Sequence, residues 1–405
     1  MATARRRTLH AAAAALLLVT CGGEPEPAGE AGGGGGARTV RVALFNVQEM
    51  STAKLMDVDD KGEGQDPQLR AAAAILQRIR PDVLVLEEID HDYDGAEHGL
   101  DLNARRFVQA YLTRGEAPLD FRYTWAAPNN TGLLSGLDLN GDGIVATEKD
   151  LRTRAHGDDS FGYGEYPGQY SMAVLSRLPL LPDRARTFAR FRWQSLPGHH
   201  MPVGFYAEAA REALRLSSKS HWDLPVQVAD TVLHLLVSHP TPPVFDGEED
   251  RNGRRNFDEI RFWALYLDDA PELEDDAGRQ GGYDSDAPFV VVGDLNARPN
   301  ADESLYDGRT AISQLLEHPR IQDTGDLLIS EGGRRGRPAG PPDHWERATT
   351  GFGGGSRIDY LLPSIGIEVL DGGVFWPDAA SDPEGAAWAD AASDHRLIWL
   401  DLRLP

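Results

Sequence analysis

The stretch VVVGDLNA, residues 290–297, is a run of apolar residues that ends in an acid and an amide. Apolar runs bounded by polar residues recur in LFNVQ (44–48), VLVLEEI (83–89), LLVSHP (235–240), SRIDYLL (356–362) and SDHRLIWL (393–400). A buried strand that ends in a carboxylate or imidazole delivers that group to the rim of a sheet, where it can act on a ligand. One such ending is a common turn, but six favour a hard-metal site with histidine acid/base chemistry.

Strand and helix patterns alternate along the chain from residue 39. The first unit is a strand at 40–45, a helix with apolar residues from Leu69 to Ile79, and a strand at 83–86. Further strands are expected at 121–125, 170–175, 232–237, 289–292, 358–362 and 397–402, and helices near 103–112 and 255–267. Mixed elements without an internal repeat predict a single α/β or α+β domain. Long polar connections, at 128–168, 182–230, 241–287 and 331–350, account for its large size.

The composition is strongly acidic, with a net charge of −24 over 405 residues. This charge argues against nonspecific binding to nucleic acid, which depends on Lys and Arg neutralising phosphates. It does not exclude an enzyme that approaches phosphates through a bound cation, because the metal then supplies the positive charge locally.

The N-terminus has the features of an export signal. Residues 5–7 are three arginines, residues 11–19 are an apolar run too short to span a bilayer, and Cys21 is the single cysteine. Residues 18–21 (LVTC) resemble a bacterial lipoprotein cleavage box, so we expect residues 1–21 to be a signal peptide whose cysteine is lipidated. The alternative is an ordinary secretory signal with an incidental cysteine. Residues 22–38, rich in Gly, Pro and Glu, are expected to be a flexible tether to a domain at 39–405.

In their order along the chain, these motifs resemble the endonuclease/exonuclease/phosphatase superfamily. That superfamily includes secreted deoxyribonucleases, abasic-site endonucleases, sphingomyelinases and inositol-polyphosphate phosphatases, and the similarity covers nearly all of residues 39–404. The resemblance implies an α+β fold, a four-layer α/β/β/α sandwich in which two mixed β-sheets face each other, here with long loop insertions. It also implies a divalent-metal phosphoesterase whose site lies at one rim of the sandwich.

The resemblance also implies roles for individual residues. Asn46, Glu88 and Asp394 correspond to metal-binding positions, and Tyr170, His239, Asp294, Asn296, Asp359 and His395 to catalytic ones. Adjacent residues at a strand start point to opposite faces, so Asp359 is the expected orienting partner of His395, and Asp394 a ligand of metal or water. Glu87 stands where the family usually has Gln. The acidic partner that His239 has in the deoxyribonuclease branch has no identifiable counterpart in this sequence.

Two loops carry further patterns. Asp138, Asn140 and Asp142 reproduce the first half of a calcium loop, but Lys149 stands where the bidentate acid is expected. A structural Ca²⁺ site and a solvated acidic turn therefore both remain open. Residues 215–223 (RLSSKSHWD) combine two cations, a histidine and a tryptophan, and either contact substrate or carry solvated charges on a loop anchored by Trp222. We favour the second interpretation.

The sequence thus predicts a phosphoester hydrolase of nuclease or phosphodiesterase type that uses Mg²⁺ or Mn²⁺. We expect it to be monomeric and exported, either secreted or held at the bacterial cell envelope by a lipid on Cys21. Its partner is a phosphoester substrate, with nucleic acid among the candidates. The alternatives are a phosphomonoesterase or a lipid or inositol phosphatase of the same fold, and a non-catalytic calcium-dependent binding lipoprotein.

Overall fold

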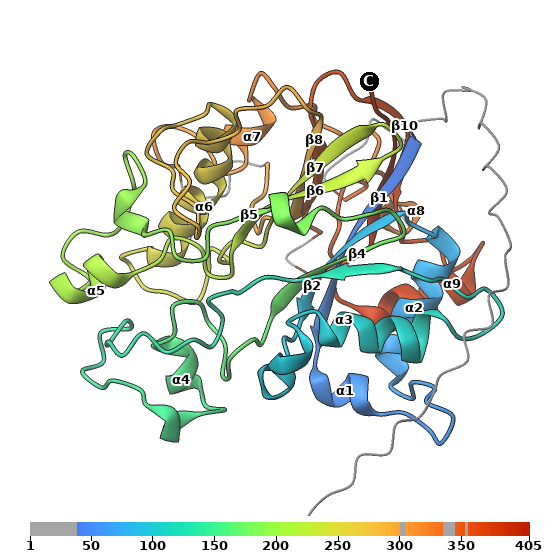
Figure 1. Cartoon of the computed structure of the whole chain (residues 1–405), viewed down its shortest axis with the longest axis horizontal. Coiled ribbons are helices and arrows are strands. Elements are labelled where there is room, and N and C mark those ends of the chain that lie inside the picture. Colours follow the sequence, from blue (N-terminus) through green and yellow to red (C-terminus); the bar gives the residue numbers. More distant parts are fainter. Residues whose placement is uncertain (1–38, 300–304, 335–344, 353–354) are drawn as a thin grey trace, which may run out of the picture. The chain divides into compact units, whose positions relative to one another are not determined.

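The computed structural model describes residues 39–299, 305–334, 345–352 and 355–405. The predicted signal peptide, lipoprotein box and tether, at residues 1–38, lie outside the described residues. In the part of the chain that is described, two β-sheets lie face to face and helices cover their outer sides (Figure 1). No helix within these ranges is long and apolar enough to cross a membrane.

The first sheet has six strands in the order β10-β11-β1-β2-β4-β3. Their bounds are β10 Glu368–Val374, β11 Ile398–Arg403, β1 Thr39–Met50, β2 Val83–Ile89, β4 Ser171–Ser176 and β3 Tyr123–Trp125. Strands β1 and β2 are parallel, whereas the other neighbours are antiparallel. The parallel pair requires a crossover, which the helix α2 (Pro67–Ile79) provides.

The second sheet has five strands in the order β5-β6-β7-β8-β9. Their bounds are β5 Arg186–Thr187, β6 His221–Val228, β7 Thr231–Ser238, β8 Phe289–Asp294 and β9 Asp359–Pro363. Here β7 and β8 are the parallel pair, and the helix α6 (Arg251–Leu267) lies between them in the chain. Both sheets are therefore mixed, as the resemblance implies.

The remaining helices are short. The α-helices are α1 Thr52–Met56, α3 Leu102–Phe107, α4 Arg154–Asp158, α5 Glu208–Ala213, α7 Ser313–Leu316, α8 Glu331–Arg334 and α9 Pro383–Ala392. A π-helical turn, Val108–Leu112, extends α3. Four 3₁₀ turns lie at Tyr93–His98, Glu148–Asp150, Pro182–Arg184 and Trp193–Ser195.

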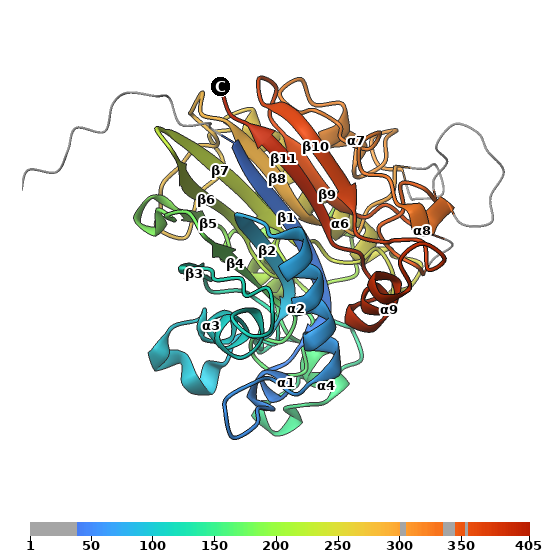
Figure 2. The same ribbon diagram turned by 90° about the vertical axis from the view of Figure 1, so that its right-hand side faces the viewer.

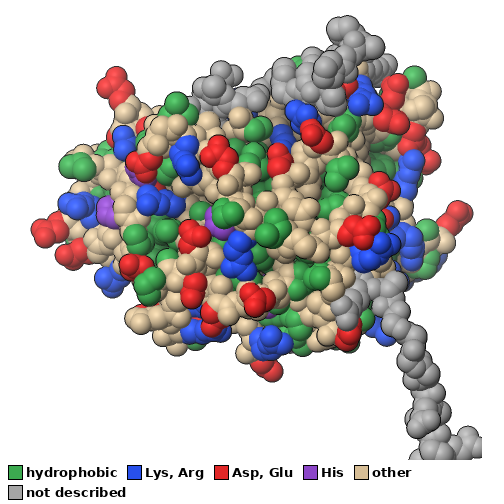
Figure 3. Space-filling model, turned by 90° about the horizontal axis from the view of Figure 1, so that it is seen from above, with side chains coloured by type: hydrophobic (Ala, Val, Ile, Leu, Met, Phe, Trp, Pro, Cys, Tyr) green, Lys and Arg blue, Asp and Glu red, His purple; other side chains and the backbone are tan. Residues whose placement is uncertain are grey.

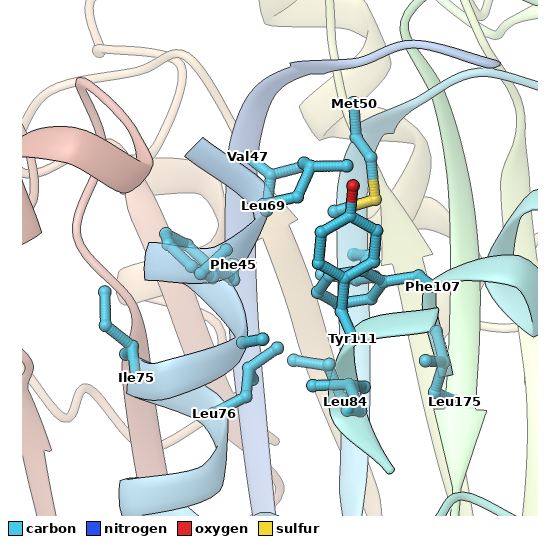
Figure 4. Close-up of a cluster of buried hydrophobic side chains, with 14 of the residues drawn as sticks. Phe45, Val47, Met50, Leu69, Ile75, Leu76, Leu84, Phe107, Tyr111 and Leu175 are labelled. Atoms are coloured by element: carbon cyan, nitrogen blue, oxygen red, sulfur yellow. The ribbon is translucent and has the colours of Figure 1, made fainter. Parts of the chain in front are cut away.

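Three apolar clusters define the layers of the sandwich. One fills the space between the sheets and consists mainly of Val and Leu, such as Val42 on β1 and Val292 on β8. A second packs α2, α3 and α9 against the outer face of the first sheet, where Phe45 of β1 lies among helix side chains (Figure 4). A third packs α6 and α7 against the second sheet. Figure 2 shows α2, α3 and α9 along the first sheet, which confirms the four-layer α/β/β/α fold.

Helix α2 illustrates how local sequence sets these elements. Its N-cap Asp66 accepts a hydrogen bond from the backbone N–H of Leu69, and Pro67 occupies the first helical position. The helix ends where Arg80 adopts a left-handed conformation. Its apolar residues are buried against β1 and β2, as the 3.6-residue periodicity predicts.

Strand β6 was not predicted and lies inside the segment 182–230, which we expected to be a polar connection. The apolar residues alternate: Trp222, Leu224 and Val226 face the other sheet. Between them, Asp223 accepts hydrogen bonds from Tyr266 and from His234 Nδ1. Because these polar groups find buried partners, a strand forms where the sequence pattern suggests an exposed loop.

Gly293 sets the close approach of β7 and β8 just before Asp294. A Cβ built on Gly293 would lie 1.9 Å from the backbone oxygen of Ser238, whereas one on Gly351 would come no nearer than 3.9 Å to any neighbour. We expect Gly293→Ala to lower the free energy of unfolding by at least about 1 kcal/mol, because the two strands must separate. Gly351→Ala is the control and should change it by less than about half of that. Guanidinium denaturation of both variants measures this, and equal stabilities would contradict the account.

Candidate active site

The polar residues at the strand ends meet at one rim of the sandwich. Asn46 on β1 is fully buried, and its Nδ2 donates to Glu88 Oε1 and to Asp294 Oδ2, both at 3.1 Å. Glu88 belongs to the first sheet and Asp294 to the second. Asn46 and Glu88, the predicted metal pair, and Asp294, predicted to be catalytic, are therefore direct neighbours, as sequence order alone did not show.

Backbone strain is concentrated at this rim. Gln48, Glu49, Glu88, Tyr170 and Asn296 all have a positive φ between 46° and 61°. Residues other than glycine adopt this region at a cost of about 1–3 kcal/mol each, and such residues cluster at functional sites. Gln48, Glu49 and Glu88 lie near the ends of β1 and β2, Asn296 follows β8, and Tyr170 directly precedes β4. The strain turns the chain sharply where the strands deliver their polar groups.

His395 and Asp359 form the predicted pair. His395 Nδ1 lies 3.0 Å from Asp359 Oδ2, and Thr349 Oγ1 donates to the same oxygen at 2.5 Å. His395 Nε2 lies 3.7 Å from Asp294 Oδ2. Burial disfavours the charged imidazolium, but the carboxylates of Asp359 and then Asp294 outweigh it and raise the pKa of His395 to about 10. Asp359 therefore orients the ring with Nε2 toward Asp294.

A second imidazole approaches Asp294 as well. His239 Nε2 lies 3.6 Å from Asp294 Oδ2, and only 3% of the residue is exposed. Burial, helped by the positive charges of Lys219 and His395, holds the pKa of His239 well below its usual value. Burial raises the pKa of Asp294 to about 7, against the opposing charge of His395. Asp294 thus lies between two imidazoles of contrasting protonation.

The other predicted site residues surround this centre. Asn296 donates from Nδ2 to the Pro240 carbonyl and from its backbone N–H to Asp294 Oδ1. Tyr170 is half-buried, and burial followed by the charges of Glu49 and Glu88 raises its pKa. Asp394 is half-buried beside His395, and its metal-binding role stays a prediction.

The donor set fits a hard divalent cation. Asp294, Asp359 and His395 each bring one oxygen or nitrogen within 4.8 Å of the others. Asp359 and His395 already pair with each other, so the carboxylates left for a cation are those of Asp294 and Glu88, which Asn46 connects. Oxygen-rich sets with few carboxylates suit Mg²⁺ or Mn²⁺. The nearby carboxylate of Asp359 adds to the raised pKa of Asp294, the sign of uncompensated negative charge that a cation would relieve.

Lys219 belongs to this centre, although it was not among the predicted site residues. It is 7% exposed, and burial lowers its pKa while the carboxylates of Glu88, Glu259 and Asp294 oppose that shift. The interpretation of residues 215–223 as a loop with solvated charges is therefore wrong, and Trp222 is a fully buried core residue of β6. In the sequence, the sign that Lys219 belongs to the site was its position just before β6, a strand that we did not predict.

The acidic loop that contains Asp138, Asn140 and Asp142 is held by hydrogen bonds between its side chains and its own backbone. Asp138 accepts from the N–H groups of Gly141 and Gly143, and Asn140 Oδ1 accepts from the N–H of Asp142. Asp150 accepts from Thr147 at the start of the next 3₁₀ turn. These bonds are compatible with both interpretations of the loop, so the structural calcium site stays a prediction.

Comparison with known proteins shows the family to which this chain belongs. The model of the endonuclease/exonuclease/phosphatase family matches residues 43–395. An endonuclease/exonuclease/phosphatase from Beutenbergia cavernae is similar over 91% of this chain and 72% of its own, with a TM-score of 0.49 and 21% identity. The human Nocturnin catalytic domain with bound sulfate is similar over 91% and 94%, with a TM-score of 0.47 and 13% identity. A lipoyl synthase from Thiobacillus denitrificans is 32% identical over 133 residues, which cover only 38% of that protein and 32% of this chain.

We expect Glu88→Gln and Asp294→Asn each to weaken Mn²⁺ binding by at least about 10-fold. This is the lower end of the loss seen when even a residue that only orients a metal ligand is removed. Isothermal titration calorimetry of each variant measures the dissociation constant. Asp142→Asn, in the exposed acidic loop, is the matched control and should bind with the affinity of the unchanged protein. Loss of the same Mn²⁺ site in the control, with Glu88→Gln unaffected, would place the cation elsewhere.

Proposed function

We propose, from the premise that this chain belongs to the endonuclease/exonuclease/phosphatase family, that it is a divalent-metal-dependent phosphoester hydrolase of nuclease or phosphodiesterase type. The observation that carries the proposal is the convergence of His239 and His395 on one oxygen of Asp294. Next to it lies Glu88, whose carboxylate offers oxygen ligands to a metal and accepts a hydrogen bond from Asn46 Nδ2. Hydrolysis of a phosphoester requires both a group that activates water and positive charge near the phosphate.

The side chains divide these tasks among themselves. Asn46 and Glu88 would hold the cation, with Asp294 at its border, and bound Mg²⁺ or Mn²⁺ would neutralise charge on the nonbridging oxygens. Asp294 takes the proton of the attacking water, because its carboxylate lies where both imidazoles converge. His395, protonated at neutral pH, donates a hydrogen bond to the phosphate. The buried Lys219 lies near these carboxylates, and Asn296 and Tyr170 would contact the phosphate.

The substrate is proposed to be a compact phosphoester rather than a long stretch of duplex. The support is the net charge of −24, since extended duplexes are bound through many basic contacts. Figure 3 shows the end of the sandwich that carries the C-terminus, away from the rim of the proposed site, and there the described Lys and Arg side chains are interspersed with Asp and Glu. Positive charge is instead supplied locally, by Lys219 and the cation.

We also propose that the enzyme acts outside the cytoplasm. The support is the sequence of residues 1–21, with its arginines, apolar run and Cys21, followed by the Gly-rich segment 22–38. Lipidation of Cys21 would leave the hydrolase attached to the cell envelope. Cleavage without lipidation would release it.

The catalytic pairing makes a quantitative prediction. His395→Ala should lower kcat for bis-p-nitrophenyl phosphate with Mn²⁺ by at least about 100-fold, the usual minimum for loss of an acid/base group. Asp359→Ala should cost a comparable factor, and the double variant should lose far less than the product, because residues acting as a unit are non-additive. Steady-state kinetics of the three variants measures this.

The matched control is another histidine–aspartate pair, which lies within the second sheet. His234 Nδ1 lies 2.6 Å from Asp223 Oδ1, on neighbouring strands. His234→Ala removes a pair of the same chemistry, so kcat should stay within about 3-fold, as for a change outside the acid/base machinery. If the loss of kcat in the double variant equals the product of the losses in His395→Ala and Asp359→Ala, the two residues act independently and the proposed pairing is wrong. Faster turnover of p-nitrophenyl phosphate than of the diester would favour a phosphomonoesterase.

A further inference from the structure

Two buried polar atoms beside the proposed site have no hydrogen-bond partner. They are Glu87 Oε1 and His239 Nδ1. Glu87 is fully buried and His239 is 3% exposed. A buried polar group without a partner costs about 1–3 kcal/mol, so such atoms call for an explanation. Here the two lie next to each other, because His239 Nδ1 is 3.8 Å from the other carboxylate oxygen, Glu87 Oε2.

The backbone of the second sheet holds Glu87 in place. Glu87 lies on β2, and its Oε2 accepts a hydrogen bond of 2.8 Å from the backbone N–H of Asp294 on β8. The carboxyl group is thus fixed between the sheets by one oxygen, which leaves the second oxygen free to accept. His239 Nδ1 lies 3.8 Å from Oε2, the oxygen already bonded to Asp294, so the imidazole or the carboxyl group must shift for Nδ1–H to bond to the free oxygen, Oε1.

The geometry repeats that of the other histidine. His395 directs Nε2 toward Asp294 Oδ2 and Nδ1 toward the carboxylate of Asp359. His239 directs Nε2 toward the same oxygen of Asp294 and Nδ1 toward the carboxylate of Glu87. Each imidazole therefore has a carboxylate behind it, and the two carboxylates come from different sheets.

We propose that Glu87 is the positioning residue of His239: its carboxylate accepts a hydrogen bond from Nδ1–H and so directs Nε2 toward Asp294 and the substrate. This rests on the proposed function. Sequence comparison with the deoxyribonuclease branch offered no acidic partner for this histidine, whereas the structure supplies one from β2. The assignment also gives a reason for a glutamate where the family usually has glutamine.

The chemistry of the two side chains explains why glutamine does not suffice. A carboxylate has two accepting oxygens, one for the N–H of Asp294 and one for Nδ1–H of His239. A glutamine at position 87 has a single accepting oxygen, which the N–H of Asp294 would occupy. Its NH₂ group would then face Nδ1–H donor to donor, and His239 would turn or change tautomer.

Glu87→Gln therefore distinguishes a residue that positions His239 from one that only fills space. Glutamine keeps the volume of the side chain and can still accept the hydrogen bond from the backbone N–H of Asp294. In ¹⁵N-edited NMR of the metal-free protein at a fixed pH, Nδ1 of His239 should carry the proton in the unchanged protein and lose that preference in Glu87→Gln. The variant should also lower kcat by about 10–100-fold with KM unchanged, the range for loss of a residue that orients a functional histidine. In a His239→Ala background, Glu87→Gln should add almost nothing.

Asp159→Asn is the control for changing a buried carboxylate. Asp159 is 3% exposed and accepts from the backbone N–H groups of Leu139 and Ala146, so its loss should lower stability without altering His239. A His239 proton on Nε2 in both the unchanged protein and Glu87→Gln would overturn the proposal. It would then assign Glu87 to charge compensation with Lys219, which also lies near it. Because the NMR needs no turnover, an inactive protein would contradict the proposed function without deciding this hydrogen bond.

Discussion

The rest of the site depends on the two hydrogen bonds that the side-chain amide of Asn46 donates. Its nitrogen donates to Glu88 in its own sheet and to Asp294 in the facing sheet. Two carboxylates this close repel each other, and an amide with two N–H groups can satisfy both. The amide therefore fixes the distance between the sheets at the rim, while the Val and Leu residues between the sheets fix it further inside.

This arrangement places ionisable groups in the buried interior of the protein. Glu87, Asp294 and Asp359 are all almost fully buried, and their positive neighbours are Lys219 and the imidazole of His395. Burial of several ionisable groups rarely stabilises a protein, but it perturbs pKa values in the way that catalysis requires. The strained backbone at Glu88, Tyr170 and Asn296 follows the same pattern. The surrounding apolar layers stabilise the protein and so compensate for the unfavourable burial and backbone strain of the site.

The sequence predicts the fold and much of the candidate site because each strand end combines an apolar run with a polar residue. Asn46, Glu88, Asp294 and His395 were found in this way. Prediction from the sequence fails where a residue's role depends on contacts that form only in the folded protein. Strand β6 was missed because Asp223 looks like a loop residue until Tyr266 and His234 are seen to pair with it. Lys219 and Glu87 were not predicted to be site residues, because only the facing sheets bring their side chains to Asp294 and His239.

The most direct test of the central claim is a crystal structure of the protein grown with Mn²⁺, with anomalous diffraction recorded above the manganese edge. If the rim is a hard-cation phosphoester site, the strongest anomalous peak will be bordered by the carboxylates of Glu88 and Asp294. A protein whose only manganese lies in the loop at Asp138–Asp142, with that rim free of metal at saturating Mn²⁺, would contradict the account.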